Sequence, residues 1–461
     1  MKRALCWIRR DLRLTDNRAL CEATESADAV AVVFIFDPEI LDPLDRDDTR
    51  VNFIHQSLRA IDEKLKQRGS QLLVRHGNPV ELVPQLAREL MADEVFTAHD
   101  LEPGALKRDR SVREALLAQG TQFKTCKDHL VRQKTEVLSQ SGTPFKVYTP
   151  YSKAWKAALI PAKDLAEYTP DLKKLLPVSD LTSLLRPWSI EEIGFVAKQP
   201  WLAAGETAAK ARLATFLPKI DAYGEMRDFP AAEATSYLSV DLRFGTISNR
   251  ELFRQAYAKT SKGAEKWLNE LIWREFYADV LANFPHVVEG TFNSSYKDLE
   301  WPGTDEMFEI WKAGQTGYPI VDAAMRCFAE TGWMHNRLRM IVASFLTKDL
   351  LVDYRKGEAY FASKLLDFEL ASNNGGWQWA ASVGVDAQPY FRIFNPYLQS
   401  VKFDTKGTFI REWVPELRGI SGDIHKPSPE VRAKAGYVPE VVDHMVQKEL
   451  AIKLLSKQSE S

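Results

Sequence analysis

The first 130 residues alternate short apolar runs with amphipathic stretches, and this alternation constrains the fold more than any other feature. Five runs are predicted to be strands: Ala4–Ile8, Ala29–Phe36, Gln71–His76, Glu94–Ala98 and Thr121–Cys126. Helical patterns such as Val80–Met91 and Leu106–Ala118 lie between them. Strands that alternate with helices form a parallel sheet covered by helices. We therefore expect an α/β, Rossmann-like domain at residues 1–130.

The phosphate-binding motifs that often accompany such a sheet are not found in this stretch. It contains neither GxGxxG nor GxxxxGK[ST], so an ordinary dinucleotide or phosphate-loop fold is not indicated. The charged segment Arg9–Leu14 leaves the first predicted strand. It is either a solvated loop or a ligand-binding turn, and the pattern alone does not decide between them.

The rest of the chain divides at about residue 204. Seven prolines interrupt residues 131–204, which we interpret as a connector. From residue 205 to 461 nearly every segment has helical periodicity, for example 205–219, 264–283, 319–331 and 334–351. The predicted architecture is thus an α/β domain, a connector and an all-helical C-terminal domain.

Composition narrows the classes of function. The formal net charge is −2, so any nucleic-acid surface must be local. The four cysteines show no CxxC spacing, which argues against a zinc site or a disulfide framework and favours a reducing cytoplasm. No apolar run approaches the roughly 18 residues of a membrane span. We expect a cytoplasmic globular protein without a metal site.

The most unusual stretch is Asn373-Asn374-Gly375-Gly376-Trp377-Gln378-Trp379, and nine of the 12 tryptophans lie after residue 200. Glycines allow a backbone to approach a ligand closely. On a helix, Trp377 and Trp379 would point roughly 200° apart and contact different neighbours. The stretch is suited either to a site for flat rings, such as a flavin or a nucleobase, or to a tryptophan-rich core.

Three further segments combine polar groups that a core does not need. Thr235–Ser239 gathers hydroxyls that suit a phosphate, or helix capping. In the predicted helix 267–277, Glu270, Trp273, Arg274 and Tyr277 share one face. In 332–340, Asn336 and Met340 share a face, and Arg339 is placed to pair with Asp367.

These motifs resemble, in the same order along the chain, those of the DNA photolyase/cryptochrome family. The resemblance rests on Trp7–Asn17, Gly317–Arg326, 332–340 and 373–396 and covers residues 4 to about 418. It implies an antenna-binding α/β domain and a helical domain that holds FAD in a U shape. The implied reaction is light-driven electron donation from reduced FAD to a lesion in ultraviolet-damaged DNA, without a metal, by a monomer.

Within the family, the chain looks like a class I cyclobutane pyrimidine dimer photolyase. Dimer-repairing members have Asn336 and Met340 at these positions, where (6-4) photolyases have histidines. Plant cryptochromes have Asp in place of Asn373, the residue implied to face the flavin N5 atom. The chain also ends soon after the helical domain, unlike many cryptochromes. The alternatives are a (6-4) photolyase, a cryptochrome-like photoreceptor, or a redox flavoprotein that does not contact DNA.

The resemblance implies roles for individual residues. FAD would be bound by Tyr223, Thr235, Ser236, Leu238, Ser239, Trp267, Glu270, Arg274, Asn336, Arg339, Asp367, Glu369 and Asn373. The catalytic set would be Glu270, Asn336, Met340 and Asn373. The lesion and its flanking phosphates would be held by Trp273, Trp379, Arg227, Arg337 and Arg392 after the lesion is flipped from the duplex. One departure is Asp367-Phe368-Glu369, where the family often has Asp-Gly-Asp.

Photoreduction in this family usually runs along three tryptophans. The resemblance places Trp377 nearest the flavin and Trp301 at the surface, but the middle position is Tyr354. Either a tyrosyl radical serves at Tyr354, or an alternative path runs through Trp311 or Trp333.

The antenna chromophore is implied by fewer residues. Folate-binding members have an Asn-Glu pair where this chain has Gly104-Ala105, so methenyltetrahydrofolate is disfavoured. Asp37, Arg50, Asp100 and Arg243 resemble members that bind a deazaflavin, although Arg243 replaces a frequent lysine. An empty or flavin-filled pocket is the alternative.

Overall fold

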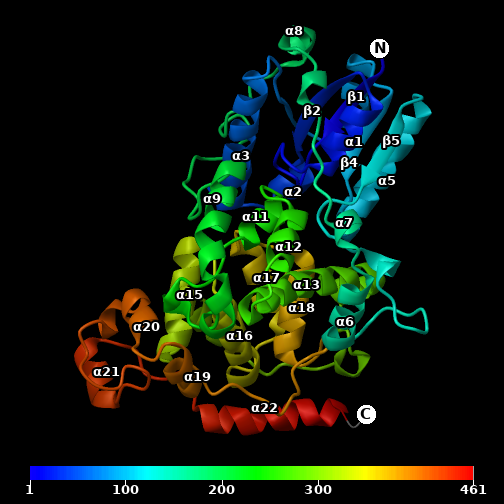
Figure 1. Cartoon of the computed structure of the whole chain (residues 1–461). Coiled ribbons are helices and arrows are strands. Elements are labelled where there is room, and N and C mark those ends of the chain that lie inside the picture. The colour runs from blue at the N-terminus through cyan, green and yellow to red at the C-terminus, as the bar shows by residue number, and fades with distance from the viewer. Residues whose placement is uncertain (460–461) are drawn as a thin grey trace. The chain divides into compact units, whose positions relative to one another are not determined.

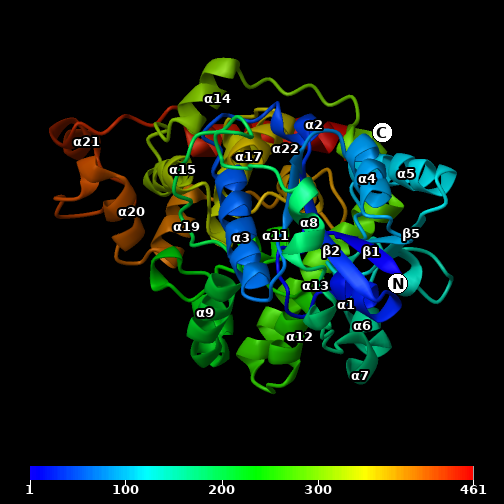
Figure 2. The same ribbon diagram turned by 90° about the horizontal axis from the view of Figure 1, so that it is seen from above.

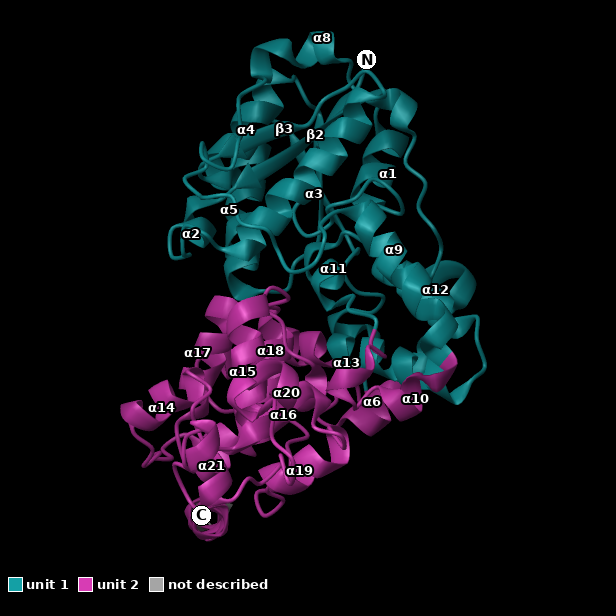
Figure 3. Ribbon diagram, turned by 90° about the vertical axis from the view of Figure 1, so that its left-hand side faces the viewer, with its two compact units in different colours: residues 1–138, 153–220, 236–275 teal, residues 139–152, 221–235, 276–461 magenta. Residues whose placement is uncertain are grey.

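The computed structural model describes residues 1–459, with side chains as far as Ser456, and consists of two compact units (Figures 1 and 3). Unit 1 contains residues 1–138, 153–220 and 236–275, and unit 2 contains 139–152, 221–235 and the chain from 276 onward. The units are interleaved in sequence, and the predicted domain limits at residues 130 and 204 stay a prediction.

Unit 1 is built on a five-stranded parallel sheet with strand order β3-β2-β1-β4-β5. The strands are β1 Arg3–Trp7, β2 Ala29–Phe36, β3 Leu73–His76, β4 Glu94–Ala98 and β5 Gln122–Cys126. All five lie where the sequence predicts them, to within two residues at each end. The predicted α/β fold of this region is confirmed.

The central strands are apolar on both faces because helices flank the sheet on both sides. Alternate residues of β1, Leu5 and Trp7, pack in one cluster with Val83 and Val112. Val83 lies on α4 and Val112 on α5, which run alongside the sheet (Figure 2). The helices of unit 1 before residue 130 are α1 Arg18–Ser26, α2 Pro38–Leu41, α3 Thr49–Lys66, α4 Pro79–Glu89 and α5 Pro103–Ala118.

The predicted connector contains one substantial helix, α6 Tyr148–Ala158, which the prolines around it concealed. Tyr151 packs on Phe276 at a ring-centroid distance of 5.1 Å. Trp155 stacks on Phe253 at 4.9 Å and donates from Nε1 to Glu275 at 2.6 Å. These two aromatic residues of the connector thus pack against phenylalanines of the helices that follow it. The short helices α7 Pro161–Asp164 and α8 Val178–Leu181 follow.

Helices make up the remainder of both units, as the periodicity predicts. Those that begin before residue 276 are α9 Glu206–Phe216, α10 Tyr223–Met226, α11 Ser239–Phe244, α12 Asn249–Tyr257 and α13 Lys262–Asn283. Those that begin after residue 276, all in unit 2, are α14 Asp305–Lys312, α15 Pro319–Thr331, α16 Asn336–Ser344, α17 Tyr354–Lys364, α18 Leu370–Ala381, α19 Pro396–Phe403, α20 Thr408–Trp413, α21 Pro429–Ala435 and α22 His444–Ser459.

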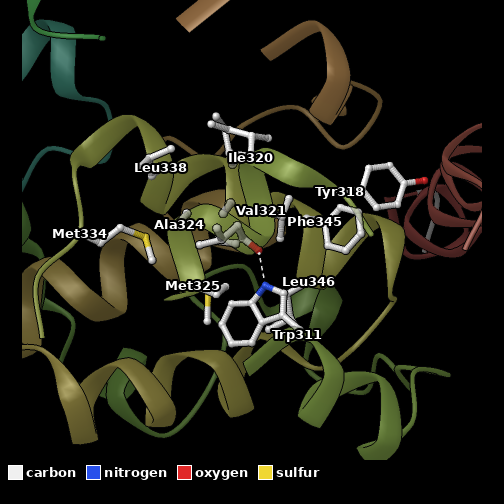
Figure 4. Packing of buried hydrophobic residues seen from close by; sticks show 14 of the residues in the cluster. Trp311, Tyr318, Ile320, Val321, Ala324, Met325, Met334, Leu338, Phe345 and Leu346 are labelled. Carbon is white, nitrogen blue, oxygen red and sulfur yellow. Dashed lines mark hydrogen bonds between the residues drawn. The ribbon is translucent and has the colours of Figure 1, made fainter. Parts of the chain in front are cut away.

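The core of unit 2 gathers side chains of α15 and α16 around Trp311 (Figure 4). Trp311 is fully buried, and its Nε1 donates to the Val342 carbonyl at 3.1 Å, so the indole nitrogen has a partner inside the apolar core. The Gly317–Arg326 motif has a structural role here. Its Asp322 carboxylate accepts from the Thr316 and Gly317 amides, at 2.7 and 3.0 Å, and from the Tyr437 hydroxyl.

One predicted helix is interrupted. The periodicity predicts a continuous helix over 334–351, but α16 ends at Ser344 and a π-helix continues from Phe345 to Asp349. Lys348 in the π-helix is fully buried, and its Nζ donates to the Ala381 carbonyl at 3.1 Å and to Ser382 Oγ at 2.9 Å. Single π-helical turns are rare within helices and leave side chains at positions that a regular helix does not reach.

The buried Lys348 gives a prediction about stability and pH. Burial lowers the pKa of Lys348 to about 7, whereas an unfolded lysine has a pKa of about 10.4. Between these values the unfolded chain binds more protons, so stability rises with pH by up to about 1.4 kcal/mol per unit. We expect the melting temperature to rise less between pH 7 and 9 in Lys348→Met than in the unmodified protein. Parallel pH profiles for the two proteins would contradict this.

No helix within residues 1–459 is long and apolar enough to cross a membrane.

Candidate functional site

The Asn373–Trp379 stretch lies on α18, and a glutamate of α17 fixes its two amides. Asn373 Nδ2 donates to the Glu358 carbonyl at 3.1 Å, and Asn374 Nδ2 donates to Glu358 Oε1 at 2.9 Å. A carbonyl accepts only from a donor, so this contact sets the orientation of the Asn373 amide. Asn373 Oδ1 is then the atom turned away from α17, as an acceptor. Burial raises the pKa of Glu358.

The two glycines of this stretch have different surroundings. A Cβ atom on Gly375 would lie 2.2 Å from Tyr277 Cδ1, whereas a Cβ atom on Gly376 would have no atom within 4 Å. Gly375 therefore permits the close packing of α18 on α13. Of the two glycines, only Gly376 leaves space that a ligand can enter.

The expected pair between α16 and the segment before α18 is formed. Arg339 Nη2 donates to both oxygens of Asp367, at 2.7 and 3.0 Å, and Arg339 Nε donates to the Met334 carbonyl at 2.8 Å. Asp367 is buried and Arg339 is partly exposed. Glu369, two residues later, is the N-cap residue of α18, and its carbonyl accepts from the Asn373 amide.

Within unit 2, the residues expected near the FAD phosphates lie in the segment 221–235. Thr235 Oγ1 is buried, and among the described residues it has no hydrogen-bond partner. A buried hydroxyl without a partner is costly, and a ligand oxygen would satisfy it. Tyr223 is buried beneath the Arg227 guanidinium, which lies 5.4 Å from the ring centroid.

The cofactor residues of unit 1 lie on α11, on α13 and in the turn before α11. Ser236 Oγ accepts from the Leu238 amide at 3.5 Å, and Ser239 begins α11. On α13, Trp267 packs on Phe216 at 4.9 Å and Arg274 donates to the His129 carbonyl at 2.8 Å. Glu270 lies 3.9 Å from Lys266 on the same helix, and Trp273 is half-buried.

The start of α16 carries residues expected to contact the lesion and its flanking phosphate. Asn336 Nδ2 lies 4.0 Å from Met340 Sδ, so the two side chains meet on one face of the helix. Arg337, on another face, pairs with Asp228 at 3.0 Å and lies over the Phe403 ring at 4.3 Å. His335 is the N-cap residue and accepts from the Arg337 amide through Nδ1. Burial lowers the pKa of His335 to about 4, so the ring is neutral at pH 7.

The loop after α18 carries Arg392. This side chain is exposed, while the Arg392 amide donates to the Pro389 carbonyl at 2.9 Å and the Arg392 carbonyl accepts from Gln388. The loop backbone is thus held by hydrogen bonds while the Arg392 guanidinium stays available to solvent.

Trp379, the other residue expected to contact the lesion from this part of the chain, lies on α18 and is half-buried against the core of unit 2.

All three residues of the expected electron relay, Trp377, Tyr354 and Trp301, belong to unit 2. Trp377 is buried and contacts Phe361 and Trp311 at centroid distances of 5.0 and 6.1 Å. Trp311 in turn contacts the half-buried Tyr360 at 6.0 Å. Tyr354 is buried at the start of α17 and Trp301 is half-buried against the core. Burial raises the pKa of Tyr354 far above its usual value, so the phenol is protonated.

A charged cluster lies at the carboxyl ends of the strands of unit 1, where open parallel sheets bind ligands. Arg10 pairs with Asp100 at 3.4 Å and with Glu102 at 3.2 Å, and Glu102 pairs with Arg243 at 2.8 Å. Burial would raise the pKa of Asp100, but Arg10 and Arg9 outweigh it and hold the pKa well below its usual value. Two of the four expected antenna residues, Asp100 and Arg243, are thereby linked.

The other two antenna residues have separate partners. Asp37 follows β2, caps α2 and lies 3.4 Å from Arg108. Arg50 pairs with Asp48 in the first turn of α3. Trp7 lies beneath Arg9, and its buried Nε1 has no hydrogen-bond partner among the described residues. Trp7 thus offers a hydrogen-bond donor that the sequence pattern did not single out.

The unit 2 residues suit a flavin nucleotide on chemical grounds. They supply a guanidinium fixed by a buried carboxylate, an amide oxygen with a set direction, space beside Gly376 and a buried hydroxyl without a partner. Flavin rings need polar partners at their edges, and phosphates need donors. Sequence reasoning missed Glu358 and Asp228. Neither residue belongs to a distinctive motif. Glu358 contacts Asn373 and Asn374, and Asp228 contacts Arg337, only because the fold brings distant parts of the sequence together.

Two family models match the chain. The model for DNA photolyase covers residues 4–171, and the model for the FAD binding domain of DNA photolyase covers residues 267–457. Among curated relatives, the deoxyribodipyrimidine photo-lyase of Vibrio cholerae is 41% identical over 98% of both chains. That of Synechococcus sp. is 40% identical over 95% of this chain and 93% of its own, and that of Escherichia coli is 38% identical over 95% of each.

Solved structures share the fold over the full length. A class III photolyase from Agrobacterium tumefaciens matches with a TM-score of 0.90 and 33% identity, covering 100% of this chain and 98% of its own. A photolyase from Sulfolobus tokodaii, solved with two FAD molecules, matches with a TM-score of 0.80 and 32% identity over 99% and 100%. A cryptochrome from Synechocystis sp. matches with a TM-score of 0.84 and 28% identity over 98% and 99%.

Proposed function

Because this chain belongs to the DNA photolyase/cryptochrome family, we propose that it is a deoxyribodipyrimidine photo-lyase that repairs cyclobutane pyrimidine dimers in ultraviolet-damaged DNA. Its substrate would be a flipped-out dimer. We further propose that it acts as a cytoplasmic monomer.

One observation supports this proposal more than any other: α16 places residues that we propose for three different functions at neighbouring positions. Asn336 and Met340 meet on one face, Arg337 lies on another, and Arg339 is fixed to Asp367. A helix that presents lesion, phosphate and cofactor groups within five residues can hold all three ligands at fixed spacing. The Asn336–Met340 contact also favours a cyclobutane dimer over a (6-4) lesion, for which the resemblance leads us to expect histidines.

When bound and reduced, FAD supplies the electron that light drives to the dimer and that returns after the cyclobutane ring opens. The protein binds and orients both partners. Trp273 and Trp379 would wall the thymine rings, and Glu270 and Asn336 would hydrogen-bond their polar edges. Arg227, Arg337 and Arg392 would hold the flanking phosphates.

Asn373 has a more specific role in this proposal. One N–H of its Nδ2 donates to the Glu358 carbonyl, and we propose that Oδ1, on the other arm of the amide, accepts from the cofactor. An acceptor favours a protonated partner atom, so Asn373 would stabilise a flavin that carries hydrogen at N5. Glu358 thereby acts as a positioning residue for Asn373.

The second chromophore is proposed for the cluster at the carboxyl ends of the strands of unit 1. Asp37, Arg50, Asp100 and Arg243 would bind a deazaflavin in preference to methenyltetrahydrofolate. A flavin is the alternative, and the Sulfolobus relative solved with two FAD molecules supports keeping it.

For photoreduction we propose that Trp377 donates an electron to the flavin and regains one mainly through Trp311 and Tyr360. These rings form a chain of contacts that begins in the core and ends at the half-buried ring of Tyr360. Trp311→Phe should then slow light-driven flavin reduction roughly tenfold, while Tyr354→Phe has a smaller effect. Absorbance bleaching in blue light with an external thiol measures both rates. A larger loss in Tyr354→Phe would establish the path through Tyr354 and Trp301 instead.

The substrate assignment is tested by offering the purified, FAD-loaded protein two damaged oligonucleotides, one with a cyclobutane dimer and one with a (6-4) product, under blue light. We expect repair of the first only. Repair of the second alone would make the protein a (6-4) photolyase. Binding and repair of neither, with FAD photoreducible, would favour a photoreceptor.

A further inference from the structure

Two of the three arginines expected to bind DNA phosphates share one carboxylate in the DNA-free protein. Asp228 Oδ2 lies 3.0 Å from Arg337 Nη2, and Asp228 Oδ1 lies 3.7 Å from Arg227 Nε. Each oxygen of Asp228 thus faces a different guanidinium. All three residues belong to unit 2, although Arg337 is more than 100 positions away in the sequence.

The surroundings of this triad are suited to a polyanion. Arg337 lies over the Phe403 ring at 4.3 Å, and Lys402 Nζ lies 5.1 Å from the centroid of the same ring. The buried Nε of Arg337 has no hydrogen-bond partner among the described residues. Asp228 therefore brings negative charge into a cluster that otherwise combines two guanidiniums with an ammonium.

A carboxylate that bridges two guanidiniums has the charge and the acceptor geometry of a phosphate. We infer that Asp228 holds the place of a DNA phosphate in the free protein and must be displaced when DNA binds. The inference rests on the proposed function, because it takes Arg227 and Arg337 to be phosphate ligands. Asp228 would be a positioning residue that keeps both guanidiniums in place and weakens their hold on any duplex.

The physical consequence is a lowered affinity for DNA. The Asp228 side chain is 31% exposed, so its Coulomb interactions are partly screened and a single pair contributes little. The free energy needed to displace the Asp228 carboxylate nevertheless reduces the net gain from every phosphate contact at this position. Because phosphate contacts dominate non-specific binding, the carboxylate limits how tightly the enzyme binds undamaged duplex.

Asp228→Asn tests this inference, since the amide keeps the shape and removes the charge. Asp298→Asn is the matched control, because it removes one negative charge from an exposed residue of unit 2 that pairs with Lys297. Binding of the FAD-loaded proteins to a labelled undamaged duplex is measured in the dark by fluorescence anisotropy between about 50 and 200 mM salt. Asp228→Ser repeats the charge removal with a smaller side chain.

We expect both Asp228 variants to bind undamaged duplex roughly fivefold more tightly at low salt, and the salt slope to steepen by about one. Asp298→Asn should leave both quantities unchanged. Unchanged or weaker binding in the Asp228 variants, with normal FAD absorbance and melting temperature, would overturn the inference, because the carboxylate would then stay paired in the complex.

The proposed function is tested separately, by comparing how tightly the unmodified protein binds an undamaged duplex and a duplex that contains a cyclobutane dimer. If the unmodified protein prefers the damaged duplex while the Asp228 variants behave like Asp298→Asn, only the inference about Asp228 fails. If the unmodified protein shows no preference for the damaged duplex while the Asp228 variants still bind undamaged duplex more tightly, only the proposed function fails.

Discussion

Gly375→Ala is expected to destabilise the protein strongly and to lower its FAD content, whereas Gly376→Ala keeps the fold intact. The methyl group at position 375 would lie 2.2 Å from Tyr277 Cδ1, far inside contact distance, and an aromatic ring cannot yield without shifting α13 or α18. Overpacking of this kind costs about 3 kcal/mol. Asn373 lies two residues away on α18, so FAD binding should weaken as well.

Gly376→Ala is the matched control for this variant. Its methyl group would meet no atom within 4 Å, and alanine favours a helix over glycine by about 1 kcal/mol. Thermal melting of the two variants without FAD should therefore shift in opposite directions. Equal destabilisation by both variants would show that the Tyr277 contact does not decide the outcome.

The second large effect is expected at the Arg339–Asp367 pair, and the two single variants should differ. The Asp367 side chain is 3% exposed and that of Arg339 is 28% exposed. Arg339→Met would leave a buried carboxylate without its partner, at a cost of roughly 3 kcal/mol. Asp367→Asn would leave a guanidinium that reaches water and keeps its bond to the Met334 carbonyl, so its cost should be smaller.

The double variant Arg339→Met/Asp367→Leu separates folding from cofactor binding. Replacing both members of a buried pair by apolar side chains is often neutral for stability. We expect the melting temperature to recover while the dissociation constant for FAD stays about 100-fold raised, as in Arg339→Met. A fluorescence titration with FAD measures the second quantity. Normal FAD affinity in the double variant would show that the pair serves the fold alone.

The fold was predictable where a local pattern decides it. The strands could be placed because apolar runs alternate with amphipathic ones, and α15 because its apolar residues follow the helical period. The π-helix after Ser344 was not predictable, because it depends on Lys348 reaching the Ala381 carbonyl and the Ser382 hydroxyl at the C-terminal end of α18. Helix α6 was hidden among prolines, and its burial rests on contacts with Phe253 and Phe276.

The candidate site divides in a similar way. Asn336 and Met340 are four residues apart, so their contact follows from helix geometry alone. Glu358 and Asp228 escaped notice because each acts on a residue that tertiary folding brings near. The sequence pattern drew attention to both glycines at 375 and 376, but only the packing of Tyr277 distinguishes a structural glycine from one with free space beside it.

Blue-light repair of an oligonucleotide with one defined thymine dimer is the decisive measurement of the proposed photolyase activity. The purified protein with reduced FAD is illuminated and compared with a dark control and with Asn336→Ala, which keeps the FAD-binding pair Arg339–Asp367. We expect light-dependent recovery of intact thymines, none in the dark, and strongly reduced recovery in the variant. No recovery in the light, with FAD bound and photoreducible, would contradict the proposed activity.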